Sequence, residues 1–366
     1  MKMNRTAISL CLLFLCAGSV SAATLQVTAT GSCPTDLSAV RSAVAGANPG
    51  DTIQLLPGSP AAEFDFTCLS PGDTVGVGVN KVGLTLEGIS TETVVRGPGF
   101  DATFVNIGFL VSADGVSFKE ITFKDFGRAI GVGFRKNVSV NFCRFENNAQ
   151  AVLATDADHL SLTHNTVQVP TPDLTPPFSS SVGFVILNES DDLLVADNTL
   201  TGPAPMFSVD LDNIAECCLG LFSAGIFQRE STSTGSLLGR ISGNDITGFD
   251  GGIQSSSDFG VVTRNTISGS AYGIIVSDDT GDGSSQVTDN TIALNSVTNS
   301  DVGLWIASGA RNVGILNDLS GNRVVGLLFL ENLGGAPSED NVFLRNKGSV
   351  KNVSGNQGPA MQDLLP

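Results

Sequence analysis

Apolar and polar residues alternate along most of this chain, in short runs that return at nearly constant spacing. The recurring unit reads apolar-x-apolar-x-x-Asn-x-apolar, followed by a turn and then by Gly-apolar-x-apolar. Its closing apolar residues recur after 21 or 22 positions, or after a longer interval where residues are inserted, and they are Phe123, Phe145, Val167, Leu200, Ile246, Ile267 and Ile292. A period of this length predicts a solenoid, in which each repeat stacks on its neighbours to build one continuous core.

The two-residue alternation predicts strands, and parallel strands stacked about 4.7–4.9 Å apart would place equivalent residues in columns. We expect the repeated Asn to take the left-handed backbone of a tight corner, and their amides to hydrogen-bond along the column. A second column is expected from the repeated Gly that opens the next strand. These residues are Asn165, Asn198, Asn244, Asn265 and Asn290, with Gly183, Gly225, Gly252, Gly273 and Gly303.

Over roughly residues 35–350, this pattern resembles the right-handed parallel β-helix repeat proteins of the pectate-lyase-like superfamily. The N-terminal segment supports the resemblance, because residues 36–44 read as one short amphipathic helix and residues 48–55 as a turn into the first strand. Those proteins place a similar cap over the open end of the coil. The expected fold is therefore all-β: a single-stranded right-handed parallel β-helix with a short N-terminal amphipathic capping helix. Such a repeat specifies the fold and says little about function.

The two ends of the chain lie outside the repeat. Residues 1–22 combine a basic start, a short apolar run and small residues at a cleavage position, which predicts a signal peptide and a secreted, periplasmic or cell-surface location. The solenoid with its cap is expected over residues 23–352, and residues 353–366 form a tail without the repeat. The mature chain has no apolar run long enough to span a membrane.

Charge narrows the possible partners. The formal net charge is −17, and it becomes −19 once Lys2 and Arg5 leave with the signal peptide. Such an acidic chain is expected to be repelled by nucleic acid and by anionic membrane surfaces. A polyanionic polysaccharide is an awkward ligand for the same reason, unless a basic patch or a bound cation reverses the local field.

Five cysteines remain after processing of the signal peptide. Cys33 and Cys68 flank the cap and are the pair that we expect to form a disulfide. Cys143 lies inside a repeat and is expected to be buried. Cys217 and Cys218 are adjacent in a long insertion and could bond to each other, pair elsewhere or remain thiols.

The insertions point to a binding edge, because in repeat proteins they emerge as loops on one face. Insertions follow Val167, Leu200 and Ile292, whereas the coils that close at Ile246 and Ile267 have short turns. The expected result is a groove between a wall of residues 168–182 and 201–224 and a second wall of residues 293–302. Its floor would offer Phe249, Asp250 and Tyr272 to a ligand.

A column of outward-pointing residues on the following strand is unusually apolar for a solvated face. It comprises Leu153, Val185, Phe227, Gln254, Ile275 and Trp305. Two interpretations stay open: the insertions fold back over this column, or it is a contact surface for carbohydrate or protein centred on Trp305, the single Trp.

One acidic loop resembles part of a calcium site. Asp278, Asp282 and Asp289 fall at positions 1, 5 and 12 of a calcium-loop pattern, and oxygen ligands at this spacing suit Ca²⁺. A loop rich in Asp and Gly without any metal is the alternative. No other cofactor is indicated.

No catalytic constellation is recognisable. A lyase needs a base and charge stabilisation, and a polygalacturonase-like hydrolase needs paired carboxylates beside a Gly-His-Gly that this chain lacks. A Thr column (Thr166, Thr199, Thr266, Thr291) is one residue wide and broken by Asp245, which argues against an ice-binding face. Three functions remain: an exported binder of a glycan or surface partner along the insertion-rich edge, a polysaccharide lyase, hydrolase or epimerase, and a structural surface spacer.

Overall fold

The structure is a computed structural model that describes residues 22–59, 61–69, 75–99, 106–171, 181–187, 190–206, 208–209, 223–229, 239–277, 287–307, 309–329 and 340–352. These residues form three long parallel sheets and the helix α1 (Cys33–Gly46). The described helical segment is too short to cross a membrane. The predicted signal peptide falls almost entirely outside the described residues, as do the C-terminal tail and the Cys217–Cys218 pair.

The three sheets, with strands counted over the described residues, run along the axis of the solenoid. Sheet A has 12 strands, in the order β1 (Thr24–Thr28), β2 (Thr52–Leu56), β5 (Thr85–Gly88), β8 (Ser117–Lys119), β11 (Ser139–Asn141), β14 (Ser161–Thr163), β17 (Leu194–Ala196), β20 (Arg240–Ser242), β23 (Val261–Thr263), β27 (Thr291–Ala293), β31 (Val313–Ile315) and β33 (Val342–Leu344). Sheet B has 9 strands, β3 (Phe64–Asp65), β6 (Val94–Arg96), β9 (Thr122–Lys124), β12 (Arg144–Glu146), β15 (Thr166–Gln168), β18 (Thr199–Thr201), β21 (Asp245–Thr247), β24 (Thr266–Ser268) and β28 (Ser296–Thr298).

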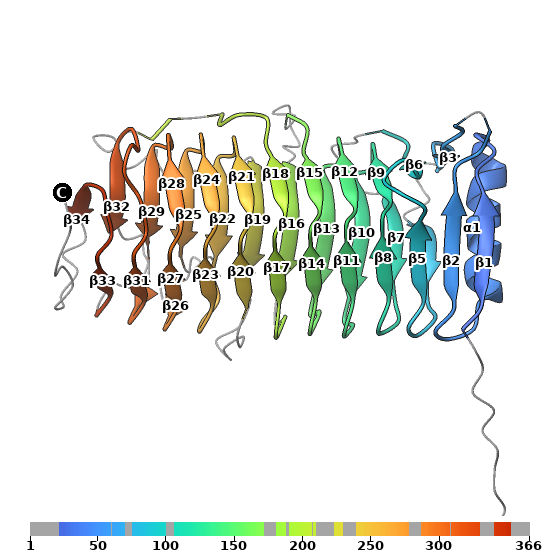
Figure 1. Ribbon diagram of the computed structural model, residues 1–366, viewed down its shortest axis with the longest axis horizontal. Coiled ribbons are helices and arrows are strands. Elements are labelled where there is room, and N and C mark those ends of the chain that lie inside the picture. Colours follow the sequence, from blue (N-terminus) through green and yellow to red (C-terminus); the bar gives the residue numbers. More distant parts are fainter. Residues whose placement is uncertain are drawn as a thin grey trace, which may run out of the picture.

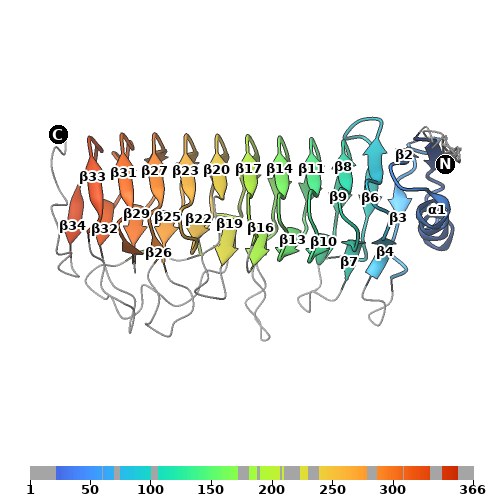
Figure 2. The ribbon, with the colours of Figure 1, turned by 90° about the horizontal axis from the view of Figure 1, so that it is seen from below.

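Sheet C has 11 strands, β4 (Val75–Val79), β7 (Ile107–Val111), β10 (Arg128–Gly133), β13 (Gln150–Thr155), β16 (Ser181–Leu187), β19 (Ser223–Arg229), β22 (Gly251–Ser255), β25 (Tyr272–Val276), β29 (Val302–Ile306), β32 (Val325–Phe329) and β34 (Val350–Asn352). A further pair joins β26 (Val287–Thr288) to β30 (Gly309–Ala310). The chain visits sheets A, B and C in turn, and each strand pairs in parallel with the equivalent strand one coil away (Figures 1 and 2). The fold is the predicted right-handed parallel β-helix.

The register of the paired strands places equivalent apolar residues of successive coils on top of one another in the core. Val167, Leu200, Ile246 and Ile267 pair in succession in sheet B, and each is at most 1% exposed. Alternation with outward polar neighbours gives each of these strands one buried and one solvated face. The recurring Gly also stack, because a Cβ on Gly252 would lie 2.6 Å from the carbonyl oxygen of Gly273.

The prediction that Ile292 stacks on Ile267 was wrong, because Ile292 lies in sheet A and Ile267 in sheet B. Ile292 pairs with Val262 in sheet A, and the partner of Ile267 in sheet B is Val297. The run Asn290-Thr291-Ile292 copies the string Asn265-Thr266-Ile267, but it occupies the preceding corner of the coil. The solenoid is unaffected, because both corners point an Asn and an apolar residue inward.

The Asn column is a buried hydrogen-bond ladder. Each side-chain amide nitrogen donates to the next Oδ1 over 2.8–3.0 Å, through Asn165, Asn198, Asn244, Asn265, Asn295, Asn317 and Asn346. A second ladder joins Asn290, Asn312 and Asn341. The expectation that these Asn take the left-handed backbone was wrong. The residue before each one does so, with φ of +57° at His164 and +56° at Arg264, which turns the Asn side chain inward.

The cap follows the prediction with one addition. Helix α1 covers the N-terminal end through Leu37, Val40 and Val44, and the Cys33–Cys68 disulfide is confirmed. Strand β1 precedes the helix and adds a strand to sheet A before the first one predicted. The buried Asp36 carboxylate joins these parts, because it accepts hydrogen bonds from the backbone at Thr30, Gly31 and Asp65.

Candidate functional site

The predicted groove lacks its second wall. Because Val297 is the sheet B residue of its coil, Leu304 follows it by seven residues, as in the short coils. Residues 293–302 are therefore β28 and its flanking corners and contain no insertion. Shallow hollows lie elsewhere in the described part of the chain, against α1 beside Arg41 and Cys68 and at the opposite end beside Ser320 and Gly348.

The expected floor residues are also buried. Phe249 is 0% exposed and belongs to the interior of the coil, while Tyr272 is 1% exposed and stacks on Trp305 at a centroid distance of 5.1 Å. Asp250 is 0% exposed and accepts hydrogen bonds from the backbone nitrogens of Met206 and Ser223, over 2.7 and 2.9 Å. These side chains hold the protein together and are not offered to a ligand.

Asp250 anchors the first part of the long insertion after β18. We call residues 202–206 and 208–209 the strap. The strap starts with hydrogen bonds from Gly202 and Ala204 to the next coil, and it follows the corner between sheets B and C toward the C-terminal end (Figure 1). At its far end the backbone nitrogen of Val209 donates to Asp301 over 2.8 Å. Two coils separate Asp250 from Asp301, about 10 Å, which three extended residues cover.

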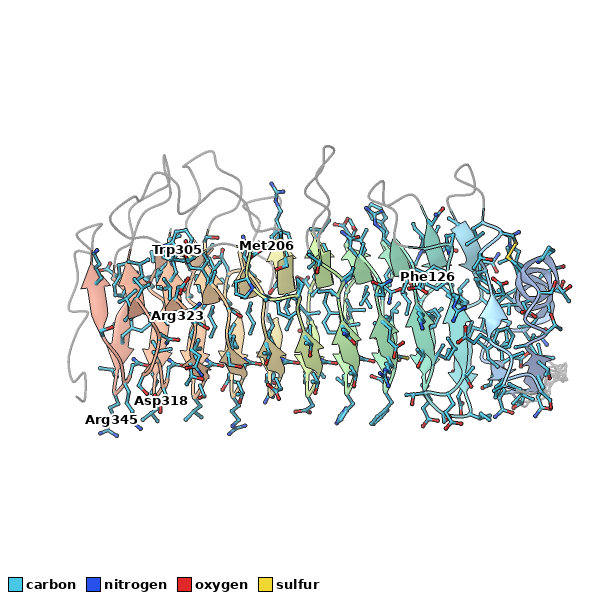
Figure 3. The ribbon with its side chains drawn as sticks, turned by 90° about the horizontal axis from the view of Figure 1, so that it is seen from above. Phe126, Met206, Trp305, Asp318, Arg323 and Arg345 are labelled. Carbon is cyan, nitrogen blue, oxygen red and sulfur yellow. A yellow bond between two sulfur atoms is a disulfide. The ribbon has the colours of Figure 1, made fainter. Side chains whose placement is uncertain are left out.

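Most of the apolar outward column is buried, although Leu153 and Phe227 are only half-buried. Leu153, Val185, Phe227, Gln254, Ile275 and Trp305 do pair in succession on sheet C as predicted. Trp305 is only 5% exposed, however, and it packs in one cluster with Val209 of the strap, Tyr272 and Leu328. Figure 3 shows Met206 and Trp305 along one long edge, with Asp318 and Arg345 at the opposite edge. The interpretation in which an insertion folds back over the column therefore holds at Trp305.

The calcium loop stays a prediction. Asp278 and Asp282 lie outside the described residues. Asp289 is engaged by Arg311, whose Nη2 and Nε lie 2.7 and 3.0 Å from its two carboxylate oxygens, and these hydrogen bonds lower the pKa of Asp289. In the described part of the chain, no three His, Cys, Asp or Glu side chains gather closely enough to hold a metal ion.

The solvated surface of sheet B offers a different site. On β15, β18, β21, β24 and β28 the outward side chains form two adjacent columns, which we call the hydroxyl face. The face comprises Thr166, Thr199, Asp245, Thr266 and Ser296 in one column, and Gln168, Thr201, Thr247, Ser268 and Thr298 in the other. Most of these side chains are exposed, and the hydroxyls of Thr247 and Ser268 lie 3.3 Å apart across adjacent coils.

Sequence reasoning recognised only half of this face. The predicted single Thr column included Thr291, which in fact belongs to sheet A. The second column was missed, although each of its members lies two residues after a member of the first. Because the face is two columns wide, its width no longer argues against an ice-binding face. Asp245 still interrupts the first column.

The composition of sheet B changes along the solenoid at equivalent positions. On β6, β9 and β12 the outward residues include Arg96, Lys124, Arg144 and Glu146. They form ion pairs, with Arg96 Nη2 at 2.7 Å from Glu63 and Arg144 Nε at 2.6 Å from Glu146. From β15 onward, Asp245 is the only charged residue of the hydroxyl face. Solvent exposure alone does not account for this difference, because both halves of the sheet face water.

Comparisons with known proteins agree with this architecture. Residues 219–360 match the family model described as "Periplasmic copper-binding protein (NosD)". A search of curated protein sequences found no significant match. Among solved structures, the tailspike protein of E. coli bacteriophage HK620, in complex with a pentasaccharide, superposes with a TM-score of 0.56 at 10% identity, over 87% of this chain and 60% of that one.

Two further structures are similar. ORF18 of Geobacillus virus E2 has a TM-score of 0.55 at 12% identity, over 91% of this chain and 63% of that one. The A-module of the mannuronan C-5 epimerase AlgE6 of Azotobacter vinelandii has a TM-score of 0.51 at 15% identity, over 91% of this chain and 95% of that one. The chain thus spans about three fifths of the length of the viral proteins. At such identities the likeness concerns the fold.

Proposed function

We propose that this right-handed parallel β-helix protein of the pectate-lyase-like type binds a neutral polysaccharide along its hydroxyl face. The observation that carries the proposal is the switch of sheet B from ion-paired charges to hydroxyl and amide groups over five successive coils. Hydroxyls and amides both donate and accept hydrogen bonds, as the hydroxyls of a sugar do. A flat array of such groups matches an extended chain better than a small molecule, which prefers a concave pocket.

The acidic charge of the protein decides which polysaccharide class is favoured. With a formal net charge of −17 and Asp245 within the face, an anionic polymer such as alginate or pectate would be repelled. The strap borders the corner beside the second column, so that the ligand would lie along the edge that carries the insertion. The tailspike likeness adds support of a general kind, because that β-helix was solved with a bound oligosaccharide.

Binding is favoured over turnover by the groups present. A lyase or epimerase needs a general base together with a cation or donor that stabilises developing charge. The hydroxyl face has Asp245 as its one ionisable side chain. The copper binding named in the family description is not extended to this chain, because residues 219–360 contain no His, Cys or Met, the side chains that copper prefers.

Export is part of the proposal. It is supported by the N-terminal sequence of residues 1–22 and by the Cys33–Cys68 disulfide, a bond that persists in oxidising compartments outside the cytoplasm. A polysaccharide ligand would then be met in the periplasm, at the cell surface or in the medium.

Retention on immobilised polysaccharides tests the function. Mature protein is passed over cellulose, xylan, mannan, starch, alginate and pectate, while reducing ends and unsaturated products are followed in the eluate. We expect retention on at least one neutral polymer, none on the two anionic polymers, and no product. Retention on none of the six, or on the anionic ones alone, would overturn the proposal.

A matched pair of variants locates the binding. Thr201→Val, Thr247→Val and Ser268→Ala combined remove three hydroxyls from the face, and Val keeps the β-branched shape of Thr. We expect retention to be lost. The control replaces Ser117, Ser139 and Ser161 by Ala on the outer face of sheet A, where Ser139 donates to Ser117 over 2.9 Å. The control should bind like the unaltered protein.

A further inference from the structure

One exposed aromatic pair stands at the N-terminal end of the hydroxyl face. Phe142 and His164 occupy the corner between sheets A and B in adjacent coils, and their rings stack with centroids 4.7 Å apart and planes 21° apart. Phe142 is 53% exposed and the His164 side chain 49%. Thr166, the first residue of the hydroxyl face, follows His164 by two positions.

The fold does not require aromatic residues at this corner. Both residues have left-handed backbone, with φ of +55° at Phe142 and +57° at His164. Gly243 fills the same position two coils beyond His164, and Asn or Gly is the least costly choice for such a backbone. A half-exposed Phe gains little from burial, so that packing does not explain the pair.

Polar groups surround the two rings. The hydroxyl of Thr163 donates to Oδ1 of Asn141 over 2.6 Å on the sheet A side, and Thr166 is exposed on the sheet B side. Charged residues border the pair on both sides. Glu120 takes the same left-handed corner position one coil before Phe142, and Oδ2 of Asp197 lies 3.9 Å from Nε2 of His164. Arg144, two residues after Phe142, is held by Glu146. Exposed rings beside hydroxyl and amide groups suit a sugar, which presents apolar C–H surface together with hydroxyls.

We propose that Phe142 and His164 form an end subsite that binds a sugar ring of the polysaccharide lying along the hydroxyl face. This inference rests on the proposed function and adds an end point to it. From Phe142 to Ser268 the path crosses four coils, about 19 Å, so that an oligosaccharide of several units would contact both parts. A disaccharide held on the Thr201–Thr247 region would not reach the rings.

The two His residues of the chain supply a direct readout. Imidazole C–H signals are recorded by NMR during titration with cellohexaose, xylohexaose and mannohexaose. The His164 signals are expected to shift with at least one hexasaccharide. His159 is a matched internal control, because its side chain is 55% exposed and lies 3.3 Å from an aspartate, Asp192, on another corner. Equal shifts of both His, or none at His164 while the hexasaccharide binds, would overturn the subsite.

A variant tests the same claim by affinity. Phe142→Asn removes the ring and keeps a residue that accepts left-handed backbone, and we expect about tenfold weaker binding of the hexasaccharide with unchanged binding of the disaccharide. Phe134→Asn is the control, because Phe134 is 72% exposed with φ of +56° at the corner between sheets C and A. Unchanged hexasaccharide affinity in Phe142→Asn contradicts the subsite alone, whereas no binding of any sugar by the unaltered protein contradicts the proposed function as well.

Discussion

The buried Asn side chains inside the ladder make hydrogen bonds to both neighbouring coils, as Asn265 shows. Asn265 is 0% exposed, and its Oδ1 accepts from both the backbone and side-chain nitrogens of Asn244. Its own amide donates to the carbonyl of Ile241 and to Asn295. Removing a group that serves donors and acceptors on both sides leaves several buried polar atoms without partners, each costing about 1–3 kcal/mol.

We therefore expect Asn265→Ala to lower the free energy of unfolding by about 3 kcal/mol, as measured by denaturant titration. Thr291→Ala is the control, because Thr291 points outward on β27, and its effect should stay within about 0.5 kcal/mol. Similar small effects of both substitutions would show that the ladder contributes little. The same residues explain a limit of sequence reading: Asn at this position was predictable, but its inward direction depends on the left-handed residue before it.

At the scale of elements, the register of β28 removes the second wall of the predicted groove, and the strap covers the outward column at Trp305. Periodicity identifies strands and their faces, and it predicted the outward column that contains Trp305. An insertion has no period, so the sequence could not show that its backbone would be fixed by two buried carboxylates. Asp301 is 3% exposed and accepts from both Val209 and Arg323, whose Nε lies 2.7 Å away.

Loosening the strap should expose the single Trp. In Asp301→Asn one acceptor oxygen is replaced by an NH₂ group that faces the N–H of either Val209 or Arg323. We expect this change to weaken the attachment of the strap to Asp301 by about 2 kcal/mol. We expect stronger acrylamide quenching of Trp305 fluorescence and a red-shifted emission. Asp318→Asn, at the opposite edge, is the control and should leave both unchanged (Figure 3). Unaltered quenching in Asp301→Asn would mean that the strap does not protect Trp305.

Across the whole molecule, the fold was predictable because the same pattern of inward apolar residues recurs in successive coils. The inward columns and the Gly column follow from spacing, whereas the cap was expected from the amphipathic segment 36–44 and the resemblance to capped β-helix proteins. The register of the last coils did not follow, because from Asn290 onward each coil carries two Asn five residues apart, as in Asn312 and Asn317. Because the corners before sheets A and B both accept Asn, short sequence motifs cannot distinguish them. Only the strand pairing shows which corner a given Asn occupies. The predicted Thr column wrongly included Thr291 for that reason.

The linear stacking of the coils also predicts how far along the solenoid the loss of the disulfide is felt. In the described sheets, strands pair only between adjacent coils, so the Cys33–Cys68 bond, which closes a loop of 35 residues, should stabilise the N-terminal end alone, by about 3–4 kcal/mol. In a Cys33→Ser, Cys68→Ser variant we expect hydrogen exchange to accelerate in α1 and in β1 to β4. Strands β20 to β29 should keep their protection, because six or more coils separate them from the cap. Uniform acceleration along the chain would instead mean that the solenoid unfolds as one cooperative unit from its capped end, and the proposed binding face would then depend on a disulfide far from it.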